Sequence, residues 1–119
     1  MNVIKPLCAG QQEKIAVVEN GKVVMILLND VVYVKSNGNF IVFHCLNNVT
    51  HTDSFGLLKA LKVLAPYGFL SIHRSFCVNK HKISSVSRTA VTRVTLADDS
   101  VLTVARRKKT KFLEQFLLP

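Results

Sequence analysis

Three clusters of polar and basic residues carry side chains suited to contact phosphates and nucleic-acid bases. They span residues 35–39 (KSNGN), residues 73–82 (HRSFCVNKHK) and residues 106–111 (RRKKTK). Arg offers a planar set of donors that fits a phosphate or the edge of guanine, and Asn can pair with adenine through two hydrogen bonds. The polar residues border apolar β-type runs, so we expect these side chains where the chain surfaces between strands.

The net charge predicts which partner these clusters meet. The chain carries 16 Lys and Arg against 7 Asp and Glu, which gives +9 over 119 residues. Residues 1–60 hold five Lys and four acids, whereas residues 61–119 hold eleven Lys and Arg and three acids. An excess of this size concentrates polyanions at a protein surface. A nucleic acid is therefore the expected partner, with its footprint in the second half of the chain.

The last cluster places five cations in six positions at the expected start of a closing helix. Cations there oppose the helix dipole at a cost of about 0.3–1 kcal/mol each. A bound phosphate would relieve that cost, whereas side chains extended into solvent would be screened by salt and would need no ligand. The other two clusters favour phosphate binding.

The remaining clusters each have a structural alternative that the residues alone leave open. Arg74 can lie over Phe69 or Phe76 and pair with an acid of the same fold. Asn37 and Asn39 are also ordinary residues of turns between strands.

Patterns typical of catalysis or cofactor binding are missing from the sequence. Its serines lie in no GxSxG turn, no HExxH is present and no Cys has a nucleophile signature. The histidines lack the spacing of a zinc pattern, and the glycines are isolated rather than gathered in a phosphate loop. The histidines are His44, His51, His73 and His81. We expect no enzymatic activity, no cofactor and no metal.

The cysteines and the absence of long apolar runs predict a cytoplasmic protein. Cys8, Cys45 and Cys77 are an odd number without CxxC spacing, and two of them lie in apolar runs where a thiol packs as a small hydrophobic group. Residues 1–12 lack the layout of a secretory signal, and no apolar run reaches the length of a membrane span.

Turn-forming residues divide the chain into short β-type runs. Asn20-Gly21 supplies the positive φ angles of a tight hairpin between residues 14–18 and 22–28. Asp98, Asp99 and Ser100 predict a second hairpin turn. Further strands are expected at residues 31–35, 40–46, 49–52, 69–73, 76–78, 83–86, 91–96 and 101–104.

Two helices are expected among the strands. One helix face is expected to carry Leu57, Leu58, Leu61, Leu64 and Ala65, with Asp53 as the expected N-cap and Pro66 after the end. From Ala105 onward the i, i+4 pairs among Phe112, Leu113, Phe116 and Leu117 predict a short closing helix whose apolar side docks on the sheets. The chain is expected to form one domain over residues 13–119, after a lead-in of residues 1–12.

Three stretches resemble the LytTR family of bacterial transcription regulators. They are residues 30–40 (DVVYVKSNGNF), residues 68–79 (GFLSIHRSFCVN), and residues 104–108 (VARRK) followed by 111–113 (KFL). The pairs HRSF and VN in the second stretch are the most specific part of the match. The stretches occur in the family's order and spacing, from about Glu13 to Leu118.

The resemblance implies a mainly β fold with one or two short helices, arranged as an elongated set of small antiparallel sheets. It implies a sequence-specific regulator whose loops enter successive grooves of double-stranded DNA. The usual targets are direct repeats in promoters, so a second copy on the adjacent half-site is the expected partner. In two-component response regulators such a domain commonly follows a receiver domain, and residues 1–12 are too few to form one. We therefore expect an excised domain or a stand-alone regulator.

Position by position, the resemblance assigns Asn39 and Arg107 to the major groove and Arg74 to the minor groove between them. His73 is expected to orient the Arg74 loop. The expected phosphate contacts are Lys35, Ser36, Ser75, Lys80, Lys82, Arg106, Lys108 and Lys109. One departure from the family pattern is Ala105, where a Ser hydroxyl often precedes the basic pair.

Two other functions remain open from sequence. A β module that binds RNA or single strands would need exposed aromatic rings, and Tyr67 alone looks free to stack. A basic face that meets an acidic protein is the second alternative, and it would leave Arg74 and Arg107 without a specific role.

Overall fold

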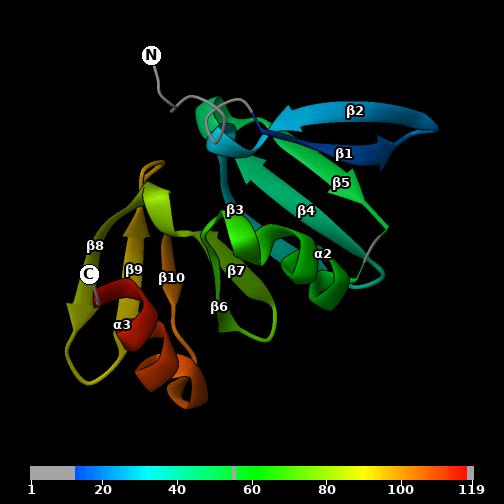
Figure 1. The fold of residues 1–119 in the computed structure, drawn as a ribbon. Helices are drawn as coiled ribbons and strands as arrows, with labels where there is room; N and C mark the ends of the chain where they lie inside the picture. Colours follow the sequence, from blue (N-terminus) through cyan, green and yellow to red (C-terminus); the bar gives the residue numbers. More distant parts are fainter. Residues whose placement is uncertain (1–12, 55, 118–119) are drawn as a thin grey trace.

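The computed structural model describes residues 13–54 and 56–117, and short antiparallel strands make up most of this part of the chain (Figure 1). The strands are β1 (Lys14–Glu19), β2 (Lys22–Leu27), β3 (Val31–Asn37), β4 (Phe40–Cys45), β5 (Thr50–Asp53), β6 (Phe69–His73), β7 (Phe76–Asn79), β8 (Ile83–Arg88), β9 (Thr92–Leu96) and β10 (Val101–Thr103). The helices are α2 (Leu57–Leu64) and α3 (Lys109–Leu117). Five single 3-10 turns connect them: η1 (Leu28–Asp30), η2 (Leu46–Asn48), η3 (Ala65–Tyr67), η4 (Lys80–Lys82) and η5 (Arg106–Lys108). The expected lead-in, residues 1–12, lies outside the described residues.

The strands form three antiparallel sheets side by side. Their strand orders are β1-β2, β5-β4-β3-β7-β6 and β10-β9-β8. The body measures 43 × 42 × 25 Å along its principal axes, so the sheets form a thin slab. The predicted fold class, mainly β with small antiparallel sheets and two short helices, is confirmed.

The first hairpin forms as its turn residues predict. Asn20 and Gly21 both have positive φ, at 52° and 78°, which is the backbone of a type I′ turn. The register then pairs Glu19 with Lys22 and continues without a shift to Lys14 opposite Leu27.

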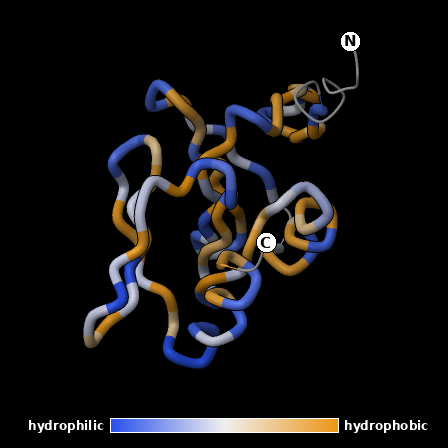
Figure 2. Tube along the Cα trace, turned by 60° about the vertical axis from the view of Figure 1, so that its left-hand side comes forward, coloured by the Kyte–Doolittle hydropathy of each residue, from blue (hydrophilic) through white to orange (hydrophobic). Residues whose placement is uncertain are grey.

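Two hydrophobic cores hold the slab together. The first lies between the β1–β2 hairpin, α2 and the central sheet, and includes Phe43 and Leu64. The second joins the central sheet to the β8–β10 sheet and α3, and includes Ile72 and Phe112. Hydrophobic and hydrophilic residues alternate along the strands in Figure 2, as expected for sheets with one face buried.

The prediction that Asp53 caps the first helix is wrong. Gly56 is the N-cap of α2, without a capping side chain, and Asp53 is the last residue of β5. Its side chain is only 2% exposed, and its Oδ2 accepts a hydrogen bond from the Val18 N–H at 2.9 Å. The carboxylate therefore accepts from a backbone N–H 35 residues away in sequence, although local spacing predicts that it caps the helix.

A reciprocal pair of carboxylates attaches β1 to β5. Asp53 of β5 accepts from β1, and Glu19 of β1 accepts the N–H of Thr52 at 2.9 Å. The other oxygen of Glu19 lies 3.1 Å from Nδ1 of His51. The hydrogen bonds from His51 and Thr52 lower the pKa of Glu19 below its ordinary value of 4.5.

The described thiols are not paired in disulfides. Cys45 and Cys77 are both free and buried. Burial raises the thiol pKa to about 11 for Cys45 and about 12 for Cys77, so neither is reactive at neutral pH. Of the helices in the described ranges, none is long and apolar enough to cross a membrane.

We expect the attachment of the hairpin to weaken in acid. Because the pKa of Glu19 is lower in the folded protein than its ordinary value of 4.5, its stabilisation is present above that pH and is lost as pH falls through the lowered value. Glu19→Gln should be less stable than the parent chain at pH 7, and this difference should shrink below about pH 4.5. Urea unfolding followed by circular dichroism over a pH series measures it.

The matched control is Glu114→Gln, which changes an exposed Glu on α3. A difference between Glu19→Gln and the parent that stays constant down to strongly acidic pH would contradict the role of the carboxylate.

Candidate nucleic-acid interface

The first candidate base reader, Asn39, lies in a two-residue turn between β3 and β4. Strand β3 continues through Ser36 and Asn37, so the break predicted for residues 36–39 is shorter and comprises only Gly38 and Asn39. Asn37 pairs with Phe40 across the turn. Gly38 has a φ of 68°, and Gly at the first central position is typical of a type II′ turn. The turn leaves the Asn39 side chain exposed.

The second candidate, Arg74, lies in the turn between β6 and β7. Its side chain is exposed. His73 spans the turn, because its Nδ1 accepts the N–H of Ser75 at 3.1 Å. The imidazole also packs against Phe76, with 5.1 Å between ring centroids. These contacts hold the backbone on both sides of Arg74, which is the geometry expected if His73 orients the loop.

Two backbone hydrogen bonds place this turn between the other two candidates. On one side Ser36 of β3 donates its N–H to the carbonyl of Ser75 at 2.8 Å. On the other side Ala105 donates its N–H to the carbonyl of Ile72 at 2.7 Å. Figure 1 shows the β6–β7 turn between the end of β3 and the start of α3. The turn that carries Arg74 thus lies between the segment that leads to Asn39 and the segment that leads to Arg107. We refer to these three residues as the row.

The third candidate, Arg107, lies in η5 at the start of the closing helix. Ala105 is the N-cap of η5 and makes no side-chain hydrogen bond there, as its methyl group requires. The first turn carries no acid, and the side chains of Arg106 and Arg107 are exposed. Phe112 is fully buried and docks this helix on the second core. The cations therefore lie at the positive end of the helix dipole, as the sequence predicts, and this position is unfavourable for them.

Among the described residues, no acid forms an ion pair with the cations of this row. Throughout the described ranges, the one ion pair within 4.0 Å joins Glu19 and His51. Arg74 is thus not paired with a described acid. A Lys takes the place over Phe76 instead, with the Nζ of Lys35 5.8 Å from the ring centroid. Guanidinium and ammonium groups that nothing neutralises are free to meet phosphates.

Two of the expected phosphate contacts do not join the row. Lys80 and Lys82 belong to η4, which follows the end of β7 opposite to Ser75. That end is fixed by Asn79, whose Oδ1 accepts the N–H of His81 at 3.0 Å and whose Nδ2 donates to the carbonyl of Val31 at 2.9 Å.

Exposed aromatic rings are more numerous than the sequence pattern indicates. Tyr67 is 42% exposed, as expected, but Phe40 is also exposed, at 39%. Phe40 begins β4 directly after Asn39, at the end of an apolar run where sequence alone predicts burial. On the same sheet Tyr33 and His44 stack with 4.3 Å between centroids, and burial lowers the pKa of His44.

Comparison with protein families gives a match over residues 21–117 to the LytTr DNA-binding domain. The chain belongs to the LytTR family. Among solved structures, the LytTr DNA-binding domain of a Bacillus cereus protein described as a methyl-accepting/DNA response regulator superposes with a TM-score of 0.77. It covers 90% of this chain and 99% of its own, at 15% identity, so the likeness concerns the fold. Comparison with curated proteins gave no match.

We expect His73 to matter for DNA affinity through the turn that it holds. In the LytTR domain with His73→Ala, the N–H of Ser75 loses its acceptor and Arg74 loses its fixed position. A lost hydrogen bond of this kind is worth about 0.5–1.5 kcal/mol, or roughly a 2- to 12-fold weaker Kd. Fluorescence anisotropy with a duplex selected from a random pool measures the change.

His73→Asn is the conservative variant, because an Asn side chain can accept from the N–H two residues on. It should recover part of the affinity. Equal affinities of His73→Ala and the parent would show that the turn does not depend on this hydrogen bond.

Proposed function

We propose that this LytTR domain binds double-stranded DNA sequence-specifically, as the output domain of a bacterial transcription regulator. The observation that carries the proposal is the row of Asn39, Arg74 and Arg107 on three exposed turns, whose neighbouring segments are joined by the backbone hydrogen bonds of Ser36 to Ser75 and of Ala105 to Ile72. Exposed turns can carry side chains into the grooves of a duplex, where the base edges are accessible. The family match supports DNA as the ligand.

We assign the three side chains of the row to two different grooves. Asn39 and Arg107 are the candidates for the major groove, where each base pair presents its own pattern of donors and acceptors. Arg74, at the middle of the row, is the candidate for the intervening minor groove, whose negative potential is strongest over A-tracts. The proposed phosphate contacts are Lys35, Ser36, Ser75, Arg106, Lys108 and Lys109.

Phosphate contacts set the position on the duplex, and base contacts set the sequence. Arg106, Lys108 and Lys109 lie at the start of α3, where an anion offsets both their mutual repulsion and the helix dipole. We leave Lys80 and Lys82 outside this footprint, because η4 is not part of the row.

The assembly that we propose is two copies on adjacent half-sites of a direct repeat, each reading successive grooves of one face. A receiver domain in the parent protein is the proposed source of regulation. The free and buried thiols Cys45 and Cys77 support a reducing cytoplasm as the compartment.

Binding of single-stranded nucleic acid is the second candidate, because Phe40 and Tyr67 expose rings on which bases could stack. Fluorescence anisotropy at physiological salt separates the two. A duplex selected from a random pool should bind about 1000-fold more tightly than the pool itself. Single-stranded RNA that ties with or exceeds the selected duplex would overturn the proposal.

Arg107→Ala and Asn39→Ala should each weaken binding to the selected duplex by about 1–3 kcal/mol and relax the preference at different base pairs. The reason is the loss of a paired contact to one base edge. Binding to a panel of single-base variants of the duplex measures it. Asn29→Ala, which changes an exposed Asn in η1 away from the row, is the matched control. Losses of the same size on random DNA would contradict base reading.

Lys109→Ala should weaken binding to all duplexes alike and reduce the slope of log K against log salt by about one unit, because one phosphate contact is lost. Lys22→Ala, at the tip of the β1–β2 hairpin, should leave the slope unchanged. A slope that Lys109→Ala does not alter would remove this residue from the footprint.

A further inference from the structure

Strand β2 leaves one of its edges open. A two-residue turn makes Glu19 and Lys22 a hydrogen-bonded pair, so alternate residues of β2 bond to β1 and those between them point outward. The bond from the Leu28 N–H to the Glu13 carbonyl, at 2.9 Å, continues the same alternation. The backbone groups of Val23 and Met25 therefore face away from β1, and no backbone group of the described chain bonds to them.

The side chains along this open edge are apolar. Val23 is 67% exposed and Met25 is 56% exposed. Proteins usually protect such edges with Pro, charged residues or bulges, and positions 23–27 (VVMIL) contain no Pro or charge and no register shift. The outer strand β8 differs, because its exposed residues are Ser84, Ser85, Ser87 and Arg88.

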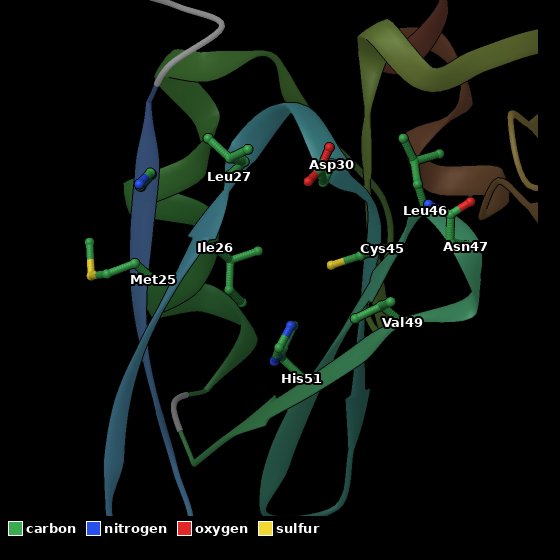
Figure 3. A pocket seen from close by; sticks show the side chains of 10 residues that line it. Met25, Ile26, Leu27, Asp30, Cys45, Leu46, Asn47, Val49 and His51 are labelled. Atoms are coloured by element: carbon green, nitrogen blue, oxygen red, sulfur yellow. The ribbon is translucent and has the colours of Figure 1, made fainter.

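The apolar surface continues from the edge into a cavity at the end of β2. This cavity has a volume of about 360 Å³ and is lined by Met25, Ile26 and Leu27 on one side and by Cys45, Val49 and His51 on the other. Figure 3 shows the sulfur of Cys45 directed into the space toward Ile26. Val49 is itself largely exposed. Edge and cavity together form one unpartnered region of the described surface. The region is apolar along the edge and mixed in the cavity, whose lining also includes Lys14, Asp30 and Asn47.

We propose that two copies of this chain pair along β2, antiparallel and centred on Met25. In that register Met25 lies opposite its own counterpart, and Val23 of one copy lies opposite Leu27 of the other. Every outward-facing pair is then apolar, and no like charges meet. The two β1–β2 hairpins become one four-stranded sheet with two-fold symmetry, in which each copy offers the same surface.

The charge distribution permits this approach. Residues 13–34 carry two Lys against three acids, whereas the whole chain has a net charge of +9. Two copies therefore meet at their least basic end. In Figure 1, β2 lies along the upper side of the molecule, and the β6–β7 turn and the start of α3 lie on the lower side. Pairing along β2 leaves the row of Asn39, Arg74 and Arg107 free, so it does not depend on the proposed DNA binding. A two-fold pair cannot place both copies on a direct repeat in the same orientation, so the β2 pair is proposed for the chain without DNA and is distinct from the assembly on the repeat.

Sedimentation equilibrium of the full chain without DNA tests the proposal. The parent chain should pass from monomer to dimer as its concentration rises. Met25→Lys places two cations opposite each other on the symmetry axis and should abolish the dimer. Leu58→Lys is the matched control, because Leu58 is 80% exposed on α2, away from the edge; it should dimerise like the parent.

A cysteine at the axis tests the register. Residues of a hydrogen-bonded antiparallel pair have Cα atoms about 5.5 Å apart, within the range of about 4.4–6.8 Å that a disulfide spans. Met25→Cys, made together with Cys8→Ser, should form a covalent dimer under mild oxidation. Ala16→Cys is the control, since Ala16 lies beside Met25 on the inner strand β1, about 4.8 Å further from the axis in each copy.

Three results would overturn the pairing. They are a parent chain that stays monomeric at every concentration, a dimer that Met25→Lys leaves intact, and equal cross-linking at positions 16 and 25.

Discussion

The turn between β6 and β7 is held from both sides by backbone hydrogen bonds, one from Ser36 and one from Ala105. These two bonds join segments that lie more than 30 residues apart along the chain. Backbone bonds depend on no particular side chain, so they fix distances between turns while leaving the side chains on those turns free to vary. The spacing of Asn39, Arg74 and Arg107 follows from this constraint. A shift of one residue in either of these two pairings would move Asn39 or Arg107 relative to Arg74.

The two cores explain why such a constraint can hold. Phe43 and Leu64 anchor the central sheet from one side, and Ile72 and Phe112 anchor the C-terminal sheet and α3 from the other. The row lies where these two packed units meet. Arg106 and Arg107 lack acidic partners among the described residues and lie at a helix start that disfavours positive charge. The folded protein thus retains an electrostatic cost, which an anionic backbone would relieve.

Local patterns in the sequence predict most of the elements. Alternating apolar residues and turn pairs such as Asn20-Gly21 locate the strands to within a few residues. The spacing of Leu57, Leu61 and Leu64 gives the side of α2 that packs on the core. The prediction that Leu58 and Ala65 share that face is wrong, because both are exposed. The N-cap prediction is wrong because a residue distant in sequence binds the polar side chain that was expected to cap the helix. Asp53 binds β1 instead of capping α2. Its partner Val18 lies 35 residues away in sequence, so a pattern of neighbouring residues does not predict this contact.

The same limit applies to the candidate site. Residue types identify the polar clusters, and resemblance to the family selects three residues within them. Lys80 and Lys82 count as neighbours of Arg74 in the sequence, but the length of β7 separates them from the Arg74 turn. The apolar run also predicts that Phe40 is buried. The run does not show that Phe40 begins the strand beside a turn, where its side chain is exposed.

The most direct measurement is a nuclear magnetic resonance titration of the ¹⁵N-labelled chain with a selected duplex, followed by backbone amide shifts. Binding through the row predicts that the largest shifts fall in three separate segments, at residues 38–39, 74–75 and 106–109, and that all three saturate together. Amides of η4 and of the β1–β2 hairpin should change little. Shifts concentrated on the open face of the central sheet, or confined to one of the three turns, would contradict groove reading by the row.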